Sequence, residues 1–184
     1  PVKAKTKKVL GLLQGYESRN ITFIEPDGSW PIVWEQAKGV HVRDADGRKY
    51  LDLTAAFGVA AAGHANPRVV RAGQQQMSRL LHAMGDVHPH EPKAHLACEL
   101  SRITFERWTK GKDITSGKVI FCNSGFEAVE AAFKTAIMAT GKPGVIAFTG
   151  AYHGLGYGAL NATHRDHFRT SFRSQLRRCA HFAP

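Results

Sequence analysis

The sequence is short of acidic residues and of cysteine. Its 184 residues include 15 Asp and Glu against 25 Lys and Arg, which gives a formal net charge of +10. The three cysteines, Cys98, Cys122 and Cys179, are odd in number and far apart. This pattern argues against a scaffold held together by disulfides and predicts a reducing, cytoplasmic environment.

Long apolar runs are also absent. No stretch approaches the roughly 20 apolar residues that a membrane-spanning helix needs, and the N-terminal residues lack the apolar segment of a secretory signal. We therefore expect no membrane partner. The sequence begins with Pro1 rather than Met, which predicts a processed or truncated chain.

The excess of basic charge allows two interpretations. The densest basic stretch runs from His164 to Arg178, and such a stretch can bind nucleic acid. The alternative is a solvated surface, or one balanced by acidic residues elsewhere in a longer protein. Because no known nucleic-acid-binding module is present, the surface interpretation is favoured and no nucleic-acid partner is expected.

The middle of the chain has the pattern strand, turn, helix, strand. Residues 119–122 (VIFC) form an apolar run of the length of a buried strand, and residues 123–125 (NSG) interrupt it. A helix is expected over residues 126–140, ending at Gly141, and Val145–Phe148 forms the second strand-like run. The pattern predicts a βαβ unit with buried parallel strands, and hence an α/β fold.

The turn before this helix has the chemistry of a phosphate site. It places the Ser124 hydroxyl and the backbone N–H groups of Gly125 and Phe126 at a helix N-terminus, where unpaired donors and the helix dipole favour an anion. A plain helix cap is the alternative. The turn differs from the common phosphate loops, because no G-x-x-x-x-G-K-[ST] occurs and the glycines at 154, 156 and 158 have the wrong spacing for a dinucleotide turn.

A second small-residue loop follows the second predicted strand. It contains Tyr152 and His153. Ligands bind beyond the carboxyl ends of parallel strands, so Ser124 and Tyr152 are expected at the same edge. Ser124 could hold a phosphate, and Tyr152 could hold a flat ring.

This combination resembles the fold type I pyridoxal-phosphate (PLP) enzymes, and specifically the class III aminotransferases. The resemblance runs from about Trp30 to the C-terminus, and several motifs occur in the family's order. These are residues 39–47 (GVHVRDADG), 50–52 (YLD), 63–64 (GH), 66–67 (NP), 123–128 (NSGFEA) and 150–154 (GAYHG).

The resemblance implies that residues 1–60 form the N-terminal segment of the small domain and residues 61–184 the start of the large PLP-binding domain. It implies a homodimer that transfers an amino group between an amino acid or ω-amine and a 2-oxo acid. The catalytic lysine and the carboxylate at the pyridine nitrogen lie further along the family's sequence than Pro184, so no catalytic residue is nominated. The alternative is a non-catalytic phosphate-ligand or interaction fragment of the same fold.

The resemblance also assigns the cofactor-binding residues. Ser124, Gly125 and Phe126 would hold the phosphate, Tyr152 would stack on the pyridoxal ring, and His153 would lie beside it. Phe126 replaces the small residue that is usual in the family at this position, so we expect it to crowd the turn.

Two residues are predicted on the substrate side. Phe57 stands where the family presents a side chain to the substrate, although a plain core role is an alternative. Asp86 lies in a loop with His82, His88 and His90. Those residue types can bind metal, but no i, i+4 histidine pair or cysteine pair supports a metal site, and none is expected.

Local signals predict further elements. A β-hairpin is expected around the turn at residues 44–47 (DADG), and helices are expected to start at residues 66–67 and 91–92 (EP). Glu127 is expected to cap or pair at the start of the central helix. Apolar residues at helical spacing predict core stripes: Val69, Gly73, Met77, Leu80 and Met84 in the first helix, and Leu96, Leu100 and Ile103 in the second.

Overall fold

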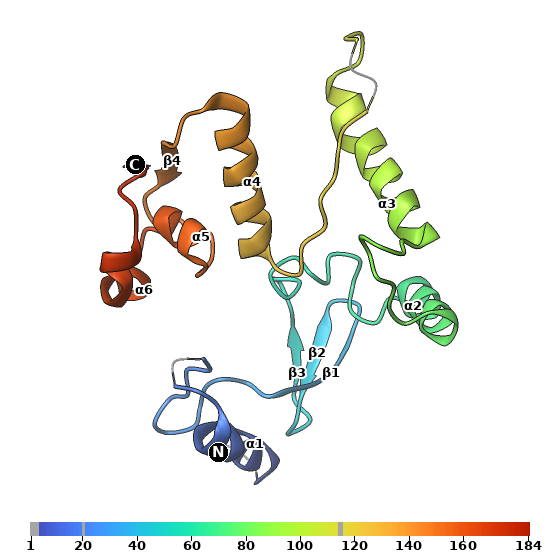
Figure 1. Ribbon diagram of the computed structural model, residues 1–184. Helices are drawn as coiled ribbons and strands as arrows, with labels where there is room; N and C mark the ends of the chain where they lie inside the picture. The colour runs from blue at the N-terminus through green and yellow to red at the C-terminus, as the bar shows by residue number, and fades with distance from the viewer. Residues whose placement is uncertain (1–3, 20, 114–115) are drawn as a thin grey trace. The chain divides into compact units, whose positions relative to one another are not determined.

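The computed structural model describes residues 4–19, 21–113 and 116–184. The chain divides into two compact units, Pro1–Met84 and Gly85–Pro184, and Figure 1 labels most of their helices and strands. The expected boundary near residue 60 separates the small and large domains of the family's fold, so this division does not test it. In the described ranges, no helix is both long and apolar enough to cross a membrane.

The first unit is built on a three-stranded antiparallel sheet. Helix α1 (Ala4–Tyr16) precedes strands β1 (Trp34–Lys38), β2 (His41–Asp44) and β3 (Lys49–Leu51), which lie in the order β1-β2-β3. The predicted hairpin is confirmed as β2 and β3. Strand β1 was not predicted from the sequence, because its residues WEQAK lack a strand pattern. Its pairing with β2 is what makes it a strand.

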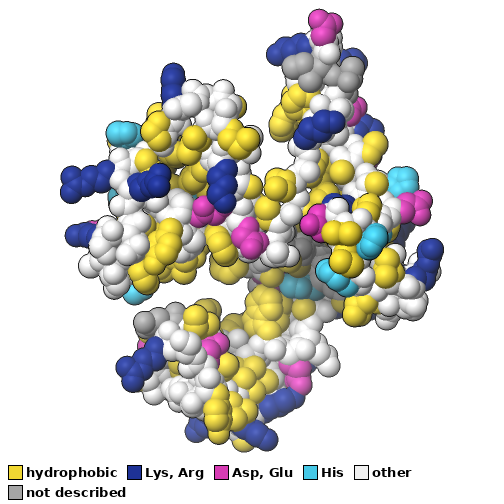
Figure 2. Space-filling view, in the orientation of Figure 1, with side chains coloured by type: hydrophobic (Ala, Val, Ile, Leu, Met, Phe, Trp, Pro, Cys, Tyr) yellow, Lys and Arg dark blue, Asp and Glu magenta, His cyan; other side chains and the backbone are white. Residues whose placement is uncertain are grey.

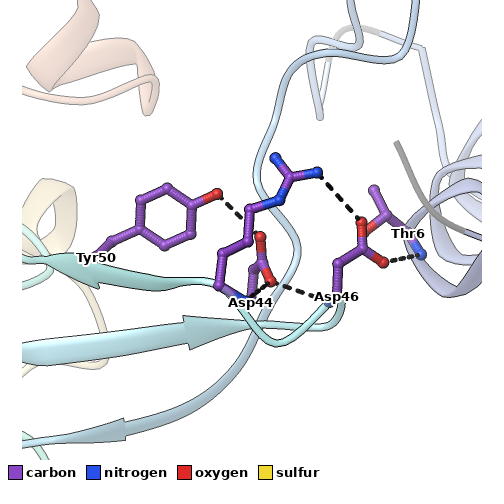
Figure 3. A network of polar contacts seen from close by, with 5 residues as sticks. Thr6, Asp44, Asp46 and Tyr50 are labelled. Atoms are coloured by element: carbon purple, nitrogen blue, oxygen red, sulfur yellow. Dashed lines mark hydrogen bonds and ion pairs between the residues drawn. The ribbon is translucent and has the colours of Figure 1, made fainter. Parts of the chain in front are cut away.

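One buried carboxylate holds the hairpin turn. Asp44 Oδ1 accepts hydrogen bonds from the backbone N–H groups of Asp46 (3.0 Å) and Arg48 (2.7 Å), and its Oδ2 accepts one from the Tyr50 hydroxyl (2.9 Å). Asp46 in turn accepts a bond from the Thr6 N–H at 3.4 Å, which links α1 to the turn (Figure 3). Burial alone would raise the pKa of Asp44, but these hydrogen bonds hold it below its ordinary value.

Helix α2 (Pro67–Arg79) begins where the sequence predicts. The Asn66 side chain accepts hydrogen bonds from the N–H groups of Arg68 (3.0 Å) and Val69 (3.4 Å), and Pro67 occupies the first turn. The predicted core stripe on this helix is wrong. α2 has no buried residue, and Met77 is 63% exposed. Spacing alone identifies an apolar face, but it does not supply an element to cover that face.

In the part of the second unit that the structure describes, there are eight helical and strand elements. They are α3 (Glu91–Ser101), the π-helical turn η1 (Arg102–Glu106), α4 (Gly125–Thr140), β4 (Val145–Phe148), α5 (Tyr157–Ala162), α6 (Asp166–Arg169), the 3₁₀ helix η2 (Thr170–Gln175) and β5 (Ala180–Ala183). Strands β4 and β5 pair in parallel from Val145 opposite Ala180 to Phe148 opposite Ala183. The crossover between them carries α5, α6 and η2, so a βαβ arrangement is present.

The predicted first strand is wrong. Residues 118–122 form no strand, although the helix that follows is confirmed within one residue. A strand needs a neighbour for its backbone donors and acceptors, and β4 pairs with β5 instead. The inward face predicted for the second helix is also wrong at two positions, because Leu96 and Ile103 are exposed.

The core of the second unit lies at α5. Ala159, Leu160, Ala162 and Thr163 are almost fully buried there, together with Ala147 of β4. Many other large hydrophobic side chains of the chain are exposed, and Figure 2 shows them as yellow patches across the visible surface. The well-packed region is therefore the one that follows β4, next to the loop predicted to carry the ligand.

Acid should weaken the first unit through Asp44. The folded state lowers this pKa, so its stabilisation is complete above the unfolded carboxyl value of about 3.9 and is lost as the pH falls through the lower folded value. Asp44→Asn should melt at a lower temperature at pH 7, and its melting temperature should fall less between pH 4 and pH 2. Circular dichroism melts measure both effects.

Asp113→Asn is the matched control, because this exposed carboxyl lies in the other unit. It should melt like the parent chain at pH 7. Parallel pH profiles for the parent chain and Asp44→Asn would contradict the role assigned to Asp44.

Candidate functional site

Helix α4 begins at a reciprocally capped turn. The Ser124 hydroxyl accepts a hydrogen bond from the Glu127 N–H (3.4 Å), while the Glu127 carboxylate accepts one from the Asn123 N–H (2.7 Å). The expected capping role of Glu127 is confirmed. Within the described residues, the N–H groups of Gly125 and Phe126 have no acceptor, since the first N–H groups of a helix lack intrahelical partners. The turn therefore offers two backbone donors and one hydroxyl proton.

The loop after β4 is fixed by a buried threonine. Thr163 Oγ1 accepts a hydrogen bond from the His153 N–H and donates one to the Gly154 carbonyl, both at 3.0 Å. The His164 N–H donates to the Ala151 carbonyl at 2.9 Å. These contacts attach the loop to the end of α5, so residues 151–154 have a defined backbone rather than a loose one.

Tyr152 projects from this loop. Its side chain is 55% exposed, and its ring meets that of Phe168 edge to face, with the centroids 5.2 Å apart. Because more than half of this side chain is exposed, part of its surface is open to a flat ligand.

The turn and the loop line one hollow of about 540 Å³. It is formed by Ser124, Gly125, Phe126, Val129, Tyr152, His153, Gly154 and Leu155. All five predicted cofactor residues are therefore brought together, although residues 118–122 form no strand. A phosphate ester of a small aromatic ring matches both the volume and the donors of this hollow.

Glycines let α4 approach the loop closely. A Cβ on Gly154, whose φ is +118°, would lie 2.2 Å from Phe126 Cβ, and one on Gly156 would lie 2.6 Å from Phe126 Cδ2. The Phe126 side chain therefore packs on these two glycines while its N–H remains at the turn. Sequence reasoning compared the glycine spacing only with nucleotide loops and missed this packing role.

Glu130, one helical turn after Phe126, adds a polar link. Its Oε1 accepts a hydrogen bond from the Ala159 N–H at 2.8 Å, and a Cβ on Gly158 would lie 2.2 Å from its Oε2. The third glycine thus makes room for a carboxylate that holds the start of α5. The alternating glycines 154, 156 and 158 could have signalled this contact.

Phe57 lies in the first unit, in a strained loop. It is 99% exposed, so the alternative core role is wrong. Ala55, Ala56 and Phe57 all have left-handed φ values, between 49° and 57°. Such values are costly for residues other than glycine, which points to strong local restraints.

Asp52 supplies those restraints. Its carboxylate accepts hydrogen bonds from the Thr54 N–H and hydroxyl and from the Ala56 N–H, and it lies 2.8 Å from His64 Nε2. The contact with His64, and then those with Thr54, lower the pKa of Asp52 far below its ordinary value.

Asp86 is not brought to the hollow at Ser124. It is exposed in a turn and is absent from that lining. Among residues 4–19, 21–113 and 116–184, no group of three His, Cys, Asp or Glu side chains is arranged to hold a metal ion.

Gly154→Ala should disrupt the contact between α4 and the loop. The methyl group would overlap Phe126, and alanine disfavours a φ of +118°. A loss of about 2–4 kcal/mol in unfolding free energy is expected from overpacking and backbone strain together. Urea unfolding followed by circular dichroism measures it.

Gly144→Ala is the matched control in the same unit, since a Cβ there meets nothing within 4 Å. Its unfolding free energy should be unchanged or slightly raised, because alanine restricts the unfolded chain. Equal losses in both variants would show that the packing of Phe126 on Gly154 is unimportant.

Sequence comparison finds many related proteins. A family model described as aminotransferase class-III matches residues 23–184. Acetylornithine aminotransferase from Archaeoglobus fulgidus is 39% identical over 141 residues, which cover 77% of this chain and 35% of that protein. The 5-aminovalerate aminotransferase of Pseudomonas aeruginosa is 41% identical over 124 residues, which cover 67% of this chain and 28% of that protein.

Solved structures show the same α/β fold. An ω-transaminase from Pseudomonas jessenii, in complex with PMP, matches all of this chain and 40% of its own with a TM-score of 0.75 at 24% identity. The taurine:2-oxoglutarate aminotransferase of Bifidobacterium kashiwanohense, in complex with PLP and glutamate, matches all of this chain and 39% of its own with a TM-score of 0.73 at 23% identity.

The chain spans 35% and 37% of the lengths of two acetylornithine aminotransferases, from A. fulgidus and Methanosarcina mazei. The family model matches most of this chain, residues 23–184. The chain therefore belongs to the class III aminotransferases, a family of PLP-dependent transferases.

Proposed function

We propose that the hollow at Ser124 binds pyridoxal phosphate, and that this chain supplies the phosphate- and ring-binding part of a class III aminotransferase. The observation that carries the proposal is the common lining of one hollow by the capped turn of α4 and the Tyr152 loop. These two segments are about 30 residues apart in the sequence.

The phosphate would be held at the N-terminus of α4. The N–H groups of Gly125 and Phe126 and the hydroxyl proton of Ser124 would donate to its oxygens, and the helix dipole adds a favourable field. Nothing lies within 4 Å of a Cβ built on Gly125, so an anion can come close to the backbone there.

The pyridoxal ring would lie against Tyr152. Its exposed ring gives a flat, largely apolar surface, and the contact with Phe168 restrains that ring. His153 would approach the ring edge, because its backbone is fixed by Thr163. These residues bind and orient the cofactor.

Bound PLP supplies a reactive carbonyl and an electron sink for amino-group transfer. The proposed whole reaction moves an amino group between an amino acid or ω-amine and a 2-oxo acid, with Phe57 and Asp86 on the substrate side. No residue of this chain is assigned the role of the family's catalytic lysine. A cytoplasmic homodimer, with residues 1–60 in the small domain, completes the proposal.

Ser124→Ala should weaken PLP binding by about 10- to 100-fold, because a donor to a charged phosphate is lost. Binding of pyridoxal, which has no phosphate, should change little. Titration monitored by cofactor absorbance gives both affinities, and inorganic phosphate should compete with PLP.

Asn66→Ala is the matched control, because it removes an N-cap from α2 in the other unit. Both variants lose a cap worth about 0.5–2 kcal/mol, but only Ser124→Ala should lose PLP affinity. Equal PLP affinity in the two variants would refute the phosphate assignment.

Borohydride reduction tests the alternative function. Cofactor that remains attached after reduction and denaturation would show a covalent link to a lysine and support an active aminotransferase. Cofactor that binds reversibly and is released on denaturation would show that the assigned residues bind it without a catalytic lysine, which both the cofactor-binding part of an aminotransferase and the phosphate-ligand module would do.

A further inference from the structure

A carboxylate and an imidazole bridge the two ends of the loop that carries Phe57. His64 Nε2 lies 2.8 Å from Asp52 Oδ2, and these two side chains are only 14% and 3% exposed. The bridge therefore closes the loop of residues 53–63 with a contact that is largely shielded from water.

Both ends of the bridge are anchored to the turn between β1 and β2. The Asp52 N–H donates a hydrogen bond to the Val40 carbonyl at 2.9 Å. The N–H and the carbonyl of His64 pair with those of Gly39, both at 2.8 Å. The ring of Trp34, on β1, meets the imidazole edge to face, with the centroids 5.8 Å apart. The bridge is therefore held by the sheet and does not depend on the loop for its place.

The anchored carboxylate holds residues 54–57 in a costly conformation. Its oxygens accept hydrogen bonds from the Thr54 N–H (2.9 Å), the Thr54 hydroxyl (2.7 Å) and the Ala56 N–H (3.2 Å). Ala55, Ala56 and Phe57 all have left-handed φ values, which residues other than glycine keep only under strong local restraint. Backbone strain of this kind is concentrated at sites that bind ligands or carry out chemistry.

The restrained loop presents an apolar ring to the outside. Phe57 is 99% exposed, so its ring contributes little to the core of its own unit. It lies at a hollow of about 680 Å³ whose walls include Trp30 and Trp34. A side chain on a restrained backbone loses little conformational freedom when it contacts a ligand, and this is the advantage that the strained loop gives to Phe57.

We propose that Asp52 and His64 are positioning residues. As one unit they fix residues 54–57 in the left-handed conformation, and so they set the side chain of Phe57 for the substrate. This role rests on the proposed function, in which Phe57 lies on the substrate side. Asp52 itself would not touch the substrate, because its side chain is buried and its oxygens already accept hydrogen bonds from the loop.

Chymotrypsin cleavage of the full chain measures whether the pair holds the loop. Proteases cut extended, accessible backbone, so the left-handed conformation should protect the bond after Phe57. His64→Leu should raise the rate of this cleavage about tenfold, the effect of one lost hydrogen bond to a carboxylate. Cleavage after Tyr16, which is 88% exposed in the same unit, is the internal reference, because general unfolding would raise both rates.

A conservative variant separates positioning from packing. His64→Gln keeps a side-chain N–H donor, and its cleavage rate after Phe57 should stay within about threefold of that of the parent chain. His41→Leu makes the same change as His64→Leu at an exposed position of β2. It is the matched control and should leave the rate unchanged.

A double variant tests whether the two residues act as one unit. Asp52→Asn should also speed cleavage after Phe57, because an amide N–H₂ would face groups that themselves donate. Adding His64→Leu to Asp52→Asn should then change the rate little, since effects within one hydrogen-bond network are not additive.

Three results would overturn the proposal: an unchanged rate in His64→Leu, equal acceleration after Tyr16, or effects that multiply in the double variant. The assay contains no cofactor. A failed PLP titration would therefore count against the proposed cofactor site alone, and an unchanged cleavage ratio against the positioning pair alone.

Discussion

The close approach of α4 to the loop after β4 is the contact on which the proposed cofactor site depends. Phe126 packs on Gly154 and Gly156, and one turn later Glu130 binds the start of α5. Two consecutive turns of α4 thus hold the segment from Gly154 to the start of α5 at both of its ends. The segment also carries the backbone that presents Tyr152, so the packing sets how far the phosphate donors lie from the ring surface.

The parts of the fold that sequence predicted correctly are those with local causes. Helix α4 begins just after Ser124 and ends just before Gly141, because a side-chain cap and a left-handed glycine act within one turn of the chain. The same holds for the start of α2 at Asn66 and for the hairpin turn at Asp44. The five residues that the resemblance assigned to the cofactor line one hollow, and their role in binding it stays a prediction.

The parts that sequence did not predict depend on distant partners. Residues 119–122 have strand composition but pair with no other described residue, while β1 has poor strand composition and pairs with β2. The apolar residues of α2 do recur at helical spacing, but this spacing cannot show whether another part of the chain packs on them. The roles of Gly154 and Glu130 were missed for the same reason, since each acts across more than 20 residues of sequence.

Ser124 joins folding to ligand binding through one atom. Its hydroxyl oxygen accepts the Glu127 N–H that starts α4, and only its proton is left for a ligand. A ligand that orients this proton also fixes the oxygen lone pairs toward the helix, so occupancy and helix stability rise together by mass action. The lifetime of this segment against proteolysis would then rise with the concentration of a ligand that binds at this turn.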